Sequence, residues 1–311
     1  MPERSALKAV TVGAREIRAA VSMAEAIDAV RRGFADLAGG AFEMPTRTVL
    51  GDGRFLVMSA HHRPTASAMI KTLSLNFERR PAIAGTVVWS ETGRLDHLVA
   101  DAGAVTTLRT GAAVGVATDL LAPPGAGRLT MIGAGAQAPD QVRAVHAVRP
   151  LRRLTVVDHH PGRAEALVSA LRPELDGAEL RTAADPESAV RDAEIVCCAT
   201  TATEPLFAAE ALPERVHVNA IGAFRPTMRE LPDELLASGT VVIDELAAIL
   251  EESGEIIHAL QAGAITQDAL TELGTALTSG ADGGTRTVFK TVGIAMQDWA
   301  VARLLADKFL P

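Results

Sequence analysis

The fold of this chain is decided by the run Leu129-Thr130-Met131-Ile132-Gly133-Ala134-Gly135-Ala136-Gln137-Ala138. An apolar, strand-like segment ends abruptly at a glycine-rich turn, and a helical pattern follows it from Val142 to Val148. This is the G-x-G-x-x-A form of a dinucleotide-binding fingerprint. Gly133 permits the tight turn, Gly135 lets the backbone approach a pyrophosphate, and Ala138 allows the helix to pack closely on the sheet. The start of the helix then offers free N–H groups to the phosphates.

A second strand pattern supports this interpretation. Leu154 to Val157 is apolar and ends in Asp158, at the place where such folds hold the hydroxyls of the adenosine ribose. An ordinary strand-to-helix turn could produce the glycine motif by itself. The strand before it, the helix after it and the acid at the expected distance together indicate nucleotide binding.

From Gly127 to about Ile243 the pattern alternates between strand and helix, which is typical of a doubly wound parallel sheet. The expected strands are 128–132, 153–158, 178–182, 194–199, 216–221 and 240–243. Thr200 follows one of the later strands and Ile221 to Phe224 follows the next, so these residues should line the nucleotide crevice. The apolar period from Val288 to Ala300 predicts a last helix, which we expect to return to the first part of the chain.

The part of the chain before the fingerprint has a different pattern. Ser22 and Glu25 form a capping box that predicts a helix running to about Ala38. Short strand candidates with turn signals follow, and no crossover helix separates them. They are 46–50, 54–59, 68–75 and 85–90. We therefore expect a mostly antiparallel sheet with helices, distinct from the later parallel sheet.

Composition sets the class of protein. The 311 residues are enough for two domains with their own cores. A net charge of -8 argues against nucleic acid or an acidic membrane as a partner. Cys197 and Cys198 are adjacent in an apolar run, so their spacing predicts core packing in a reducing compartment, with no disulfide framework and no metal site. The amino-terminal residues have no apolar signal region and no apolar run reaches spanning length, so we expect a cytoplasmic protein.

Three cations stand out by their neighbours. The period of two in a strand places Lys71 on the same face as Met69 and Leu73, where an ammonium must be paired or have a function. Alternatively, Lys71 could lie on an edge strand with its side chain facing water. Arg47 by itself would most often be a surface residue. Arg109 lies in a helix lined with small residues, so we expect its guanidinium to bind a carboxylate or a phosphate.

Seven segments together resemble the ornithine cyclodeaminase/mu-crystallin family, in the same order and over nearly the whole chain. They are Pro45-Thr46-Arg47, Ile70-Lys71, Gly85-Thr86, Leu108-Arg109-Thr110-Gly111-Ala112, Gly133-Ala134-Gly135-Ala136-Gln137-Ala138, Asn219-Ala220-Ile221-Gly222 and Val288-Phe289-Lys290-Thr291-Val292-Gly293. The resemblance implies a homodimer that acts on small α-amino or α-imino acids with NAD(P).

The resemblance also implies how the chain is divided. Residues 1–123 and 286–311 would form an α+β domain for substrate binding and dimerisation, and residues 124–285 a Rossmann domain. By the same resemblance Lys71, Arg47 and Arg109 would be catalytic and hold the substrate, together with Phe224 and Val292. The implied cofactor contacts are Thr86, Thr110, Gly133, Gly135, Ala136, Gln137, Asp158, Thr200, Ile221, Gly222, Ala223, Phe224, Met228 and Thr291.

One departure from the family pattern concerns the kind of reaction. Ornithine cyclodeaminases and related alanine dehydrogenases carry an acid/base aspartate where this chain has Phe224. Phenylalanine cannot exchange a proton, so cyclodeamination of ornithine is not expected. The run from Phe224 to Leu231 is instead similar to the ketimine reductases of the family, which reduce Δ1-pyrroline-2-carboxylate and Δ1-piperideine-2-carboxylate to L-proline and L-pipecolate.

That chemistry needs a hydride and a proton. Lys71 is our candidate for the proton donor, with its pKa lowered by apolar neighbours and nearby arginines. Glu230 is a weaker candidate, because an acid at a helix start is more often on the surface. Two other functions stay open at this stage: an alanine or N-alkyl-amino-acid dehydrogenase, and a non-catalytic protein that binds a small ligand, as mu-crystallin does.

The choice between NADH and NADPH depends on the end of the second strand. Asp158 would accept hydrogen bonds from the ribose hydroxyls of NADH and would repel the extra phosphate of NADPH. His159, His160 and Arg163 follow at once and could pair with that phosphate. The acid is fixed by a strand and the histidines are mostly neutral at neutral pH, so we expect NADH to be preferred and NADPH to be possible.

Overall fold

The structure, a computed structural model, describes most of the chain in two compact units. The residues outside the description are 1–7, 77, 80 and 281–283, so the amino-terminal segment in which no signal region was expected lies outside it. The first unit is Met1–Arg109 with Ile294–Pro311, and the second is Thr110–Gly293. Residues 110–123 and 286–293 therefore fall in the second unit, whereas the sequence prediction assigned them to the first domain.

The first unit contains a mostly antiparallel sheet of seven strands. Its order is β1-β7-β6-β5-β4-β2, with β3 paired to β4, and the β1–β7 pair is parallel. The strands are β1 (Ala9–Val12), β2 (Phe42–Glu43), β3 (Thr48–Leu50), β4 (Phe55–His62), β5 (Ser67–Leu75), β6 (Ile83–Glu91) and β7 (His97–Asp101). The antiparallel sheet predicted from the sequence is thus confirmed, and β1, β2 and β7 add strands that the pattern did not indicate.

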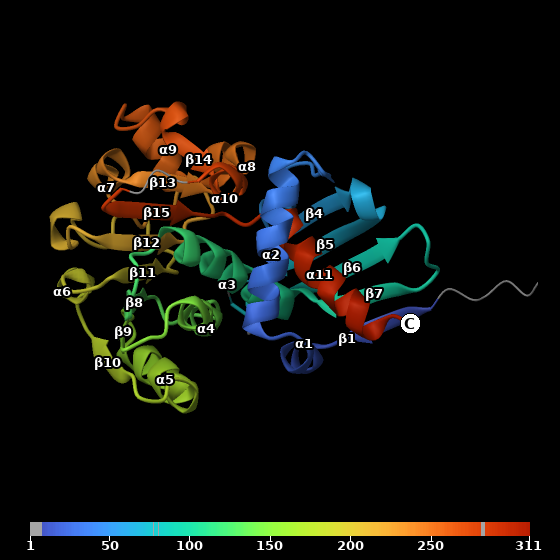
Figure 1. Ribbon diagram of the computed structural model, residues 1–311, viewed down its shortest axis with the longest axis horizontal. Helices are drawn as coiled ribbons and strands as arrows, with labels where there is room; N and C mark the ends of the chain where they lie inside the picture. The colour runs from blue at the N-terminus through green and yellow to red at the C-terminus, as the bar shows by residue number, and fades with distance from the viewer. Residues whose placement is uncertain (1–7, 77, 80, 281–283) are drawn as a thin grey trace, which may run out of the picture. The chain divides into compact units, whose positions relative to one another are not determined.

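Helices cover one face of this sheet. Helix α11 (Ala295–Phe309) lies across β4 to β7, and α2 (Met23–Ala38) packs on α11 (Figure 1). The predicted capping box is confirmed at the start of α2, because the backbone N–H of Ser22 donates to the Glu25 carboxylate at 2.8 Å and the Ser22 hydroxyl caps the first turn. The short elements α1 (Ala14–Ala20) and η1 (Arg63–Thr65) also belong to this unit.

The second unit contains the predicted parallel sheet. Its eight strands have the order β10-β9-β8-β11-β12-β15-β13-β14, and every pair in it is parallel. The strands are β8 (Arg128–Ile132), β9 (Arg153–Val157), β10 (Glu179–Ala183), β11 (Ile195–Cys198), β12 (Val216–Ala220), β13 (Thr240–Ile243), β14 (Leu270–Glu272) and β15 (Arg286–Lys290). The strand order reverses between β8 and β11, and in such sheets ligands bind at the carboxyl edge at that point.

Helices flank both faces of the parallel sheet (Figure 1). Helix α3 (Ala102–Leu121) begins in the first unit and continues into the second. The other elements are α4 (Ala138–Val148), α5 (Pro161–Leu171), η2 (Arg172–Glu174), α6 (Pro186–Val190), η3 (Ala209–Ala211), α7 (Asp233–Ser238), α8 (Leu246–Glu252), α9 (Gly254–Gln261), η4 (Gln267–Ala269) and α10 (Leu273–Ser279). Among the described residues, no helix is long and apolar enough to cross a membrane.

The helix predicted from Val288 to Ala300 is wrong in its first half. Residues Arg286–Lys290 form β15, which lies between β12 and β13, and α11 begins only at Ala295. A strand buried on both faces gives a continuous apolar run, and such a run cannot be told from a buried helix by its period. Gly293, with a φ of 83°, separates the two elements.

Candidate functional site

Lys71 lies inside the first unit. Strand β5 is paired on both sides, with β4 and β6, and Lys71 points to the same face as Met69 and Leu73. Its side chain is fully buried. The period of two therefore placed Lys71 correctly, and the alternative of an edge lysine facing water is wrong.

The Lys71 ammonium is held by two partners from other elements. It donates to the Asp298 carboxylate of α11 at 2.7 Å and to the Thr106 hydroxyl of α3 at 2.6 Å. Asp298 is also fully buried, so the pair is shielded from water. A buried ammonium is tolerated in a core only when such partners replace its hydration.

Arg109 extends this cluster. Its Nε atom lies 3.4 Å from the Asp298 carboxylate, and its Nη1 donates to the Gln297 side-chain oxygen at 2.5 Å. The sequence predicted a carboxylate or a phosphate as the partner of the Arg109 guanidinium, and in the structure this partner is the Asp298 carboxylate of the same unit. Asp298 Oδ2 and Gln297 Nε2 are buried and have no hydrogen-bond partner among the described residues. Buried polar atoms normally have partners, so Asp298 Oδ2 can still accept a hydrogen bond and Gln297 Nε2 can still donate one.

The surroundings shift the acidity of Lys71. Burial lowers its pKa to about 8, and the positive charges of Arg109 and Arg47 act in the same direction. The Asp298 carboxylate acts in the opposite direction and keeps the ammonium form. A lysine with this pKa holds a proton at neutral pH and releases it more readily than a lysine in water.

The fingerprint turn in the second unit has the geometry that its glycines require. Gly133 has a φ of 96°, and a Cβ atom there would lie 2.5 Å from the Ala199 carbonyl oxygen, so the turn after β8 closely approaches the end of β11. A Cβ atom at Gly135 would meet no described atom within 4 Å, and Ala136 is exposed. The turn thus leaves space beside the start of α4, which is the position at which dinucleotide-binding folds hold a pyrophosphate.

Asp158 at the end of β9 supports this turn. Its carboxylate accepts hydrogen bonds from the backbone N–H groups of Ala134, at 2.7 Å, and His160, at 2.8 Å. The side chain is 4% exposed, whereas that of His159 is 78% exposed. Asp158 Oδ1 also lies 3.5 Å from the His159 ring nitrogen Nδ1. Asp158 is therefore fixed by the backbone around it, whereas the His159 ring extends into solvent.

Two further carboxylates organise the loops at the same edge of the sheet. Asp244, after β13, accepts hydrogen bonds from the Thr291 hydroxyl at 2.6 Å and from the backbone N–H of Gly293 at 2.9 Å. Glu230 joins the loops that follow β11 and β12, through Thr200 and Gly222. Glu230 is fully buried, so the prediction of a surface acid at a helix start is wrong.

The implied site residues that remain differ in their position and exposure. Thr86 pairs with Thr72 and is exposed on the sheet face opposite to that of Lys71. The Phe224 ring is stacked by the Arg225 guanidinium, 5.5 Å from the ring centroid. The other implied positions Ile221, Ala223, Met228 and Val292 are buried, and Thr110 is buried on α3.

Sequence reasoning missed three polar residues of these clusters. Gln297 and Asp298 form a polar pair inside an otherwise apolar helical run, and that contrast was a usable signal. Asp244 directly follows an apolar strand, the same pattern that drew attention to Asp158. The pairing of Asp298 with Lys71 had no signal, because 227 residues separate them.

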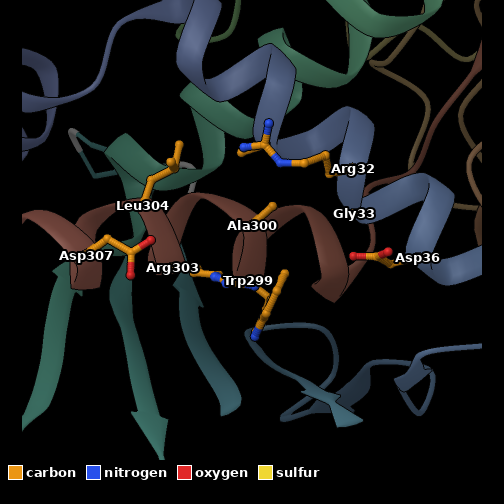
Figure 2. Close-up of a pocket in the computed structure, with 9 residues that line it drawn as sticks. Arg32, Gly33, Asp36, Trp299, Ala300, Arg303, Leu304 and Asp307 are labelled. Atoms are coloured by element: carbon orange, nitrogen blue, oxygen red, sulfur yellow. The ribbon is translucent and has the colours of Figure 1, made fainter. Parts of the chain in front are cut away.

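A groove between α2 and α11 is a separate feature of the first unit (Figure 2). It has a volume of about 220 Å³ and is lined by charged, small and aromatic residues. They are Ala29, Arg32, Gly33, Asp36, Trp299, Ala300, Arg303, Leu304 and Asp307. None of the substrate or cofactor residues implied by the sequence lines this groove.

The chain is similar to known proteins both in sequence and in structure. Residues 8–311 match the sequence model of the ornithine cyclodeaminase/mu-crystallin family. A Δ1-pyrroline-2-carboxylate reductase of Bacillus cereus is 37% identical over 213 residues, which cover 66% of this chain and 65% of that protein. The match thus spans slightly less than two thirds of the length of this relative.

Solved structures are similar over nearly the whole chain. The Δ1-pyrroline-2-carboxylate reductase of Thermococcus litoralis, in complex with NADH and L-proline, has a TM-score of 0.90 and 28% identity, and 96% of this chain and 97% of that one are covered. An archaeal alanine dehydrogenase dimer with bound NAD has a TM-score of 0.88 and 28% identity, with 96% and 95% covered. The α/β fold with its parallel sheet is therefore shared with both proteins.

Proposed function

Because this chain belongs to the ornithine cyclodeaminase/mu-crystallin family, we propose that it is an NAD(P)H-dependent reductase of cyclic ketimine carboxylates. The substrates would be Δ1-pyrroline-2-carboxylate or Δ1-piperideine-2-carboxylate, and the products L-proline or L-pipecolate. The observation that carries the proposal is the buried Lys71 ammonium beside the Arg109 guanidinium. Together they offer a proton and an anion-binding group to one small molecule.

The first unit would bind the substrate. The Arg109 and Arg47 guanidinium groups would hold the carboxylate and thereby fix the orientation of the ring. Lys71 would give its proton to the imine nitrogen, which makes the imine carbon more electrophilic. Asp298 would then stabilise the charged form of Lys71 between turnovers, because its carboxylate lies 2.7 Å from the ammonium nitrogen.

The second unit would bind the cofactor. The turn at Gly133 and Gly135 and the start of α4 would hold the pyrophosphate, and Asp158 the adenosine ribose. When bound, the reduced nicotinamide supplies the hydride that the imine carbon needs. Thr200 and Thr291 stand at the ends of other parallel strands of the same sheet, and their hydroxyls would complete the nucleotide site.

Phe224 argues against the cyclodeaminase function within the same family. It cannot act as an acid or a base, and the Arg225 guanidinium stacks on its ring. A cyclic imine already contains the C=N bond, so its reduction needs no further acid/base group for deamination. An alanine or N-alkyl-amino-acid dehydrogenase is the second candidate, because the archaeal alanine dehydrogenase is structurally similar.

A second copy of this chain is the proposed macromolecular partner. On the sheet face opposite to α11, Leu50, Phe55 and Ile70 are 50%, 52% and 51% exposed. Exposed apolar groups on one sheet face are typical of an interface. The structurally similar alanine dehydrogenase is a dimer, so we propose that this face joins two copies.

The compartment that we propose is the cytoplasm. Cys197 and Cys198 are both free and fully buried. Burial raises the pKa of the Cys197 thiol to about 12, which makes it unreactive. Free thiols packed in a core fit a reducing compartment.

Incubation with a panel of substrates tests the reaction itself. We expect NADH or NADPH oxidation with the two cyclic imine carboxylates, and no release of ammonia from L-ornithine in the presence of NAD. Pyruvate with ammonia or methylamine serves as the comparison for the dehydrogenase alternative. Faster turnover of those pairs, or proline formation from ornithine, would replace the ketimine reductase proposal.

Replacement of Lys71 by Met tests the proton donor. The variant keeps the length of the side chain and loses the proton, so kcat should fall by roughly 100-fold or more while NADH binding persists. In the wild type, kcat should be constant below the pKa of about 8 and fall as the pH rises through it, because the ammonium form is lost. The exposed Lys8→Met variant is the control. A Lys71→Met enzyme with near-normal kcat would move the proton donor elsewhere.

Replacement of Asp158 by Ser tests the cofactor preference. Wild type should have the higher kcat/KM with NADH, because the fixed Asp158 carboxylate repels the extra phosphate of NADPH. The Asp158→Ser substitution removes that repulsion, so the preference should move toward NADPH. A wild-type preference for NADPH would show that His159 and its basic neighbours outweigh the acid.

Replacement of Ile70 by Glu tests the dimer. A charge on the outward sheet face would have to be buried between two copies, so the variant should sediment as a monomer where the wild type sediments as a dimer. Leu95→Glu is the matched control, because Leu95 is 61% exposed in a loop outside the sheet. A dimeric Ile70→Glu variant would place the interface on another surface.

A further inference from the structure

Glu230 joins two loops that stand at the carboxyl edge of the parallel sheet. One oxygen of its carboxylate accepts the backbone N–H of Thr200 at 2.6 Å and the Thr200 hydroxyl at 2.8 Å. The other oxygen accepts the backbone N–H groups of Gly222 at 2.8 Å and Ala223 at 3.3 Å. A single side chain therefore fixes the loop after β11 to the loop after β12.

The glycine at position 222 is needed for this close arrangement. A Cβ atom there would lie 2.2 Å from the Thr200 carbonyl oxygen and 2.5 Å from a Glu230 carboxylate oxygen. The two loops and the carboxylate are thus packed without space for a side chain. Their relative position depends on Glu230.

Charged groups from two other elements surround Glu230. Glu255 of α9 accepts the backbone N–H of Glu230 at 2.9 Å, and Lys290 of β15 lies 2.8 Å from the Glu255 carboxylate. Lys290 also donates to the carbonyl of Ala223 at 2.6 Å. The Cys198 thiol of β11 is the remaining titratable neighbour. These three charged side chains are fully buried, and the Lys290 ammonium pairs with Glu255 and also acts electrostatically on Glu230.

We propose that Glu230 is a positioning residue for the cofactor, and that the nucleotide binds more tightly when Glu230 is ionised. The inference rests on the proposed function, because it assigns the loops after β11 and β12 to the cofactor. All four groups bonded to the carboxylate are donors. A protonated Glu230 would direct an O–H toward one of these donors and break at least one bond to a loop.

The surroundings place this ionisation in an accessible pH range. Burial raises the pKa of Glu230 to about 7, and the Glu255 carboxylate adds to the rise. Lys290 and the hydrogen bonds from Thr200 act in the opposite direction. The ionised form is therefore present above that pKa and is lost as the pH falls through it, and the affinity for the nucleotide should fall with it.

Titration of NADH binding by its fluorescence, at a series of pH values, tests the proposal without turnover. In the wild type the Kd should rise as the pH falls below about 7, by up to about tenfold per pH unit. Glu230→Gln replaces an acceptor by an NH₂ donor, so we expect a Kd at least about tenfold higher and no dependence on pH in this range. Glu255→Gln should move the midpoint of the wild-type profile to lower pH, because it removes the charge that opposes ionisation.

Glu194→Gln is the matched control. Glu194 also accepts two backbone N–H groups, from Gly127 and Arg128, but it lies at the amino edge of the same sheet. Its replacement should leave the Kd and its pH profile as in the wild type. A merely structural role of Glu230 would change the Kd without changing the profile.

The outcomes separate this inference from the proposed function. A wild type that binds no NADH at any pH would overturn the function. A wild type that binds NADH with the same pH profile as Glu230→Gln would overturn only the role of Glu230. If Glu230→Gln does not fold, the Glu255→Gln profile decides, and an unshifted midpoint would overturn the inference.

Discussion

Burial of the Lys71 ammonium is the constraint on which the first unit depends. An ammonium in a core requires partners, and Lys71 obtains them from two different helices. Thr106 of α3 and Asp298 of α11 must therefore lie on the same side of β5. Since Asp298 also contacts Arg109, the same carboxylate that makes Lys71 tolerable holds the guanidinium beside it. The Asp298 carboxylate thus both stabilises the buried Lys71 and positions the two cations, Lys71 and Arg109, side by side.

In the second unit, buried carboxylates fix the loops at one edge of the parallel sheet, as the buried Asp298 carboxylate fixes the cations of the first unit. Parallel strands bring their carboxyl ends to one edge, and loops at that edge have backbone N–H groups that need acceptors. Asp158, Glu230 and Asp244 supply them, each to a different set of loops. These carboxylates prepare the loops before any ligand arrives, so binding need not order them, and less affinity is lost to conformational entropy.

The sequence predicted the structure well where residues close together in the chain determine it. The period of two placed Lys71 in the core, and the glycine turn and Asp158 predicted from the sequence are in contact at the carboxyl edge of the parallel sheet. The helix expected from Val288 failed because a run buried on both faces has no diagnostic period. Glu230 looked like a surface acid because its donors come from loops about thirty and eight residues away. Contacts between separate loops form only in the folded chain, and they produce no periodic pattern in the sequence.

The position of α11 has a consequence for synthesis on the ribosome. The second unit is one continuous segment, 110–293, and all of it emerges before α11 does. The first unit, in contrast, needs α11 to cover its sheet and to give Lys71 its carboxylate. During translation residues 1–109 therefore emerge without α11, so that Lys71 has no Asp298 partner and one sheet face is uncovered until the last helix is made. We therefore expect the second unit to complete its fold before the first unit does, although β1 to β7 are synthesised earlier.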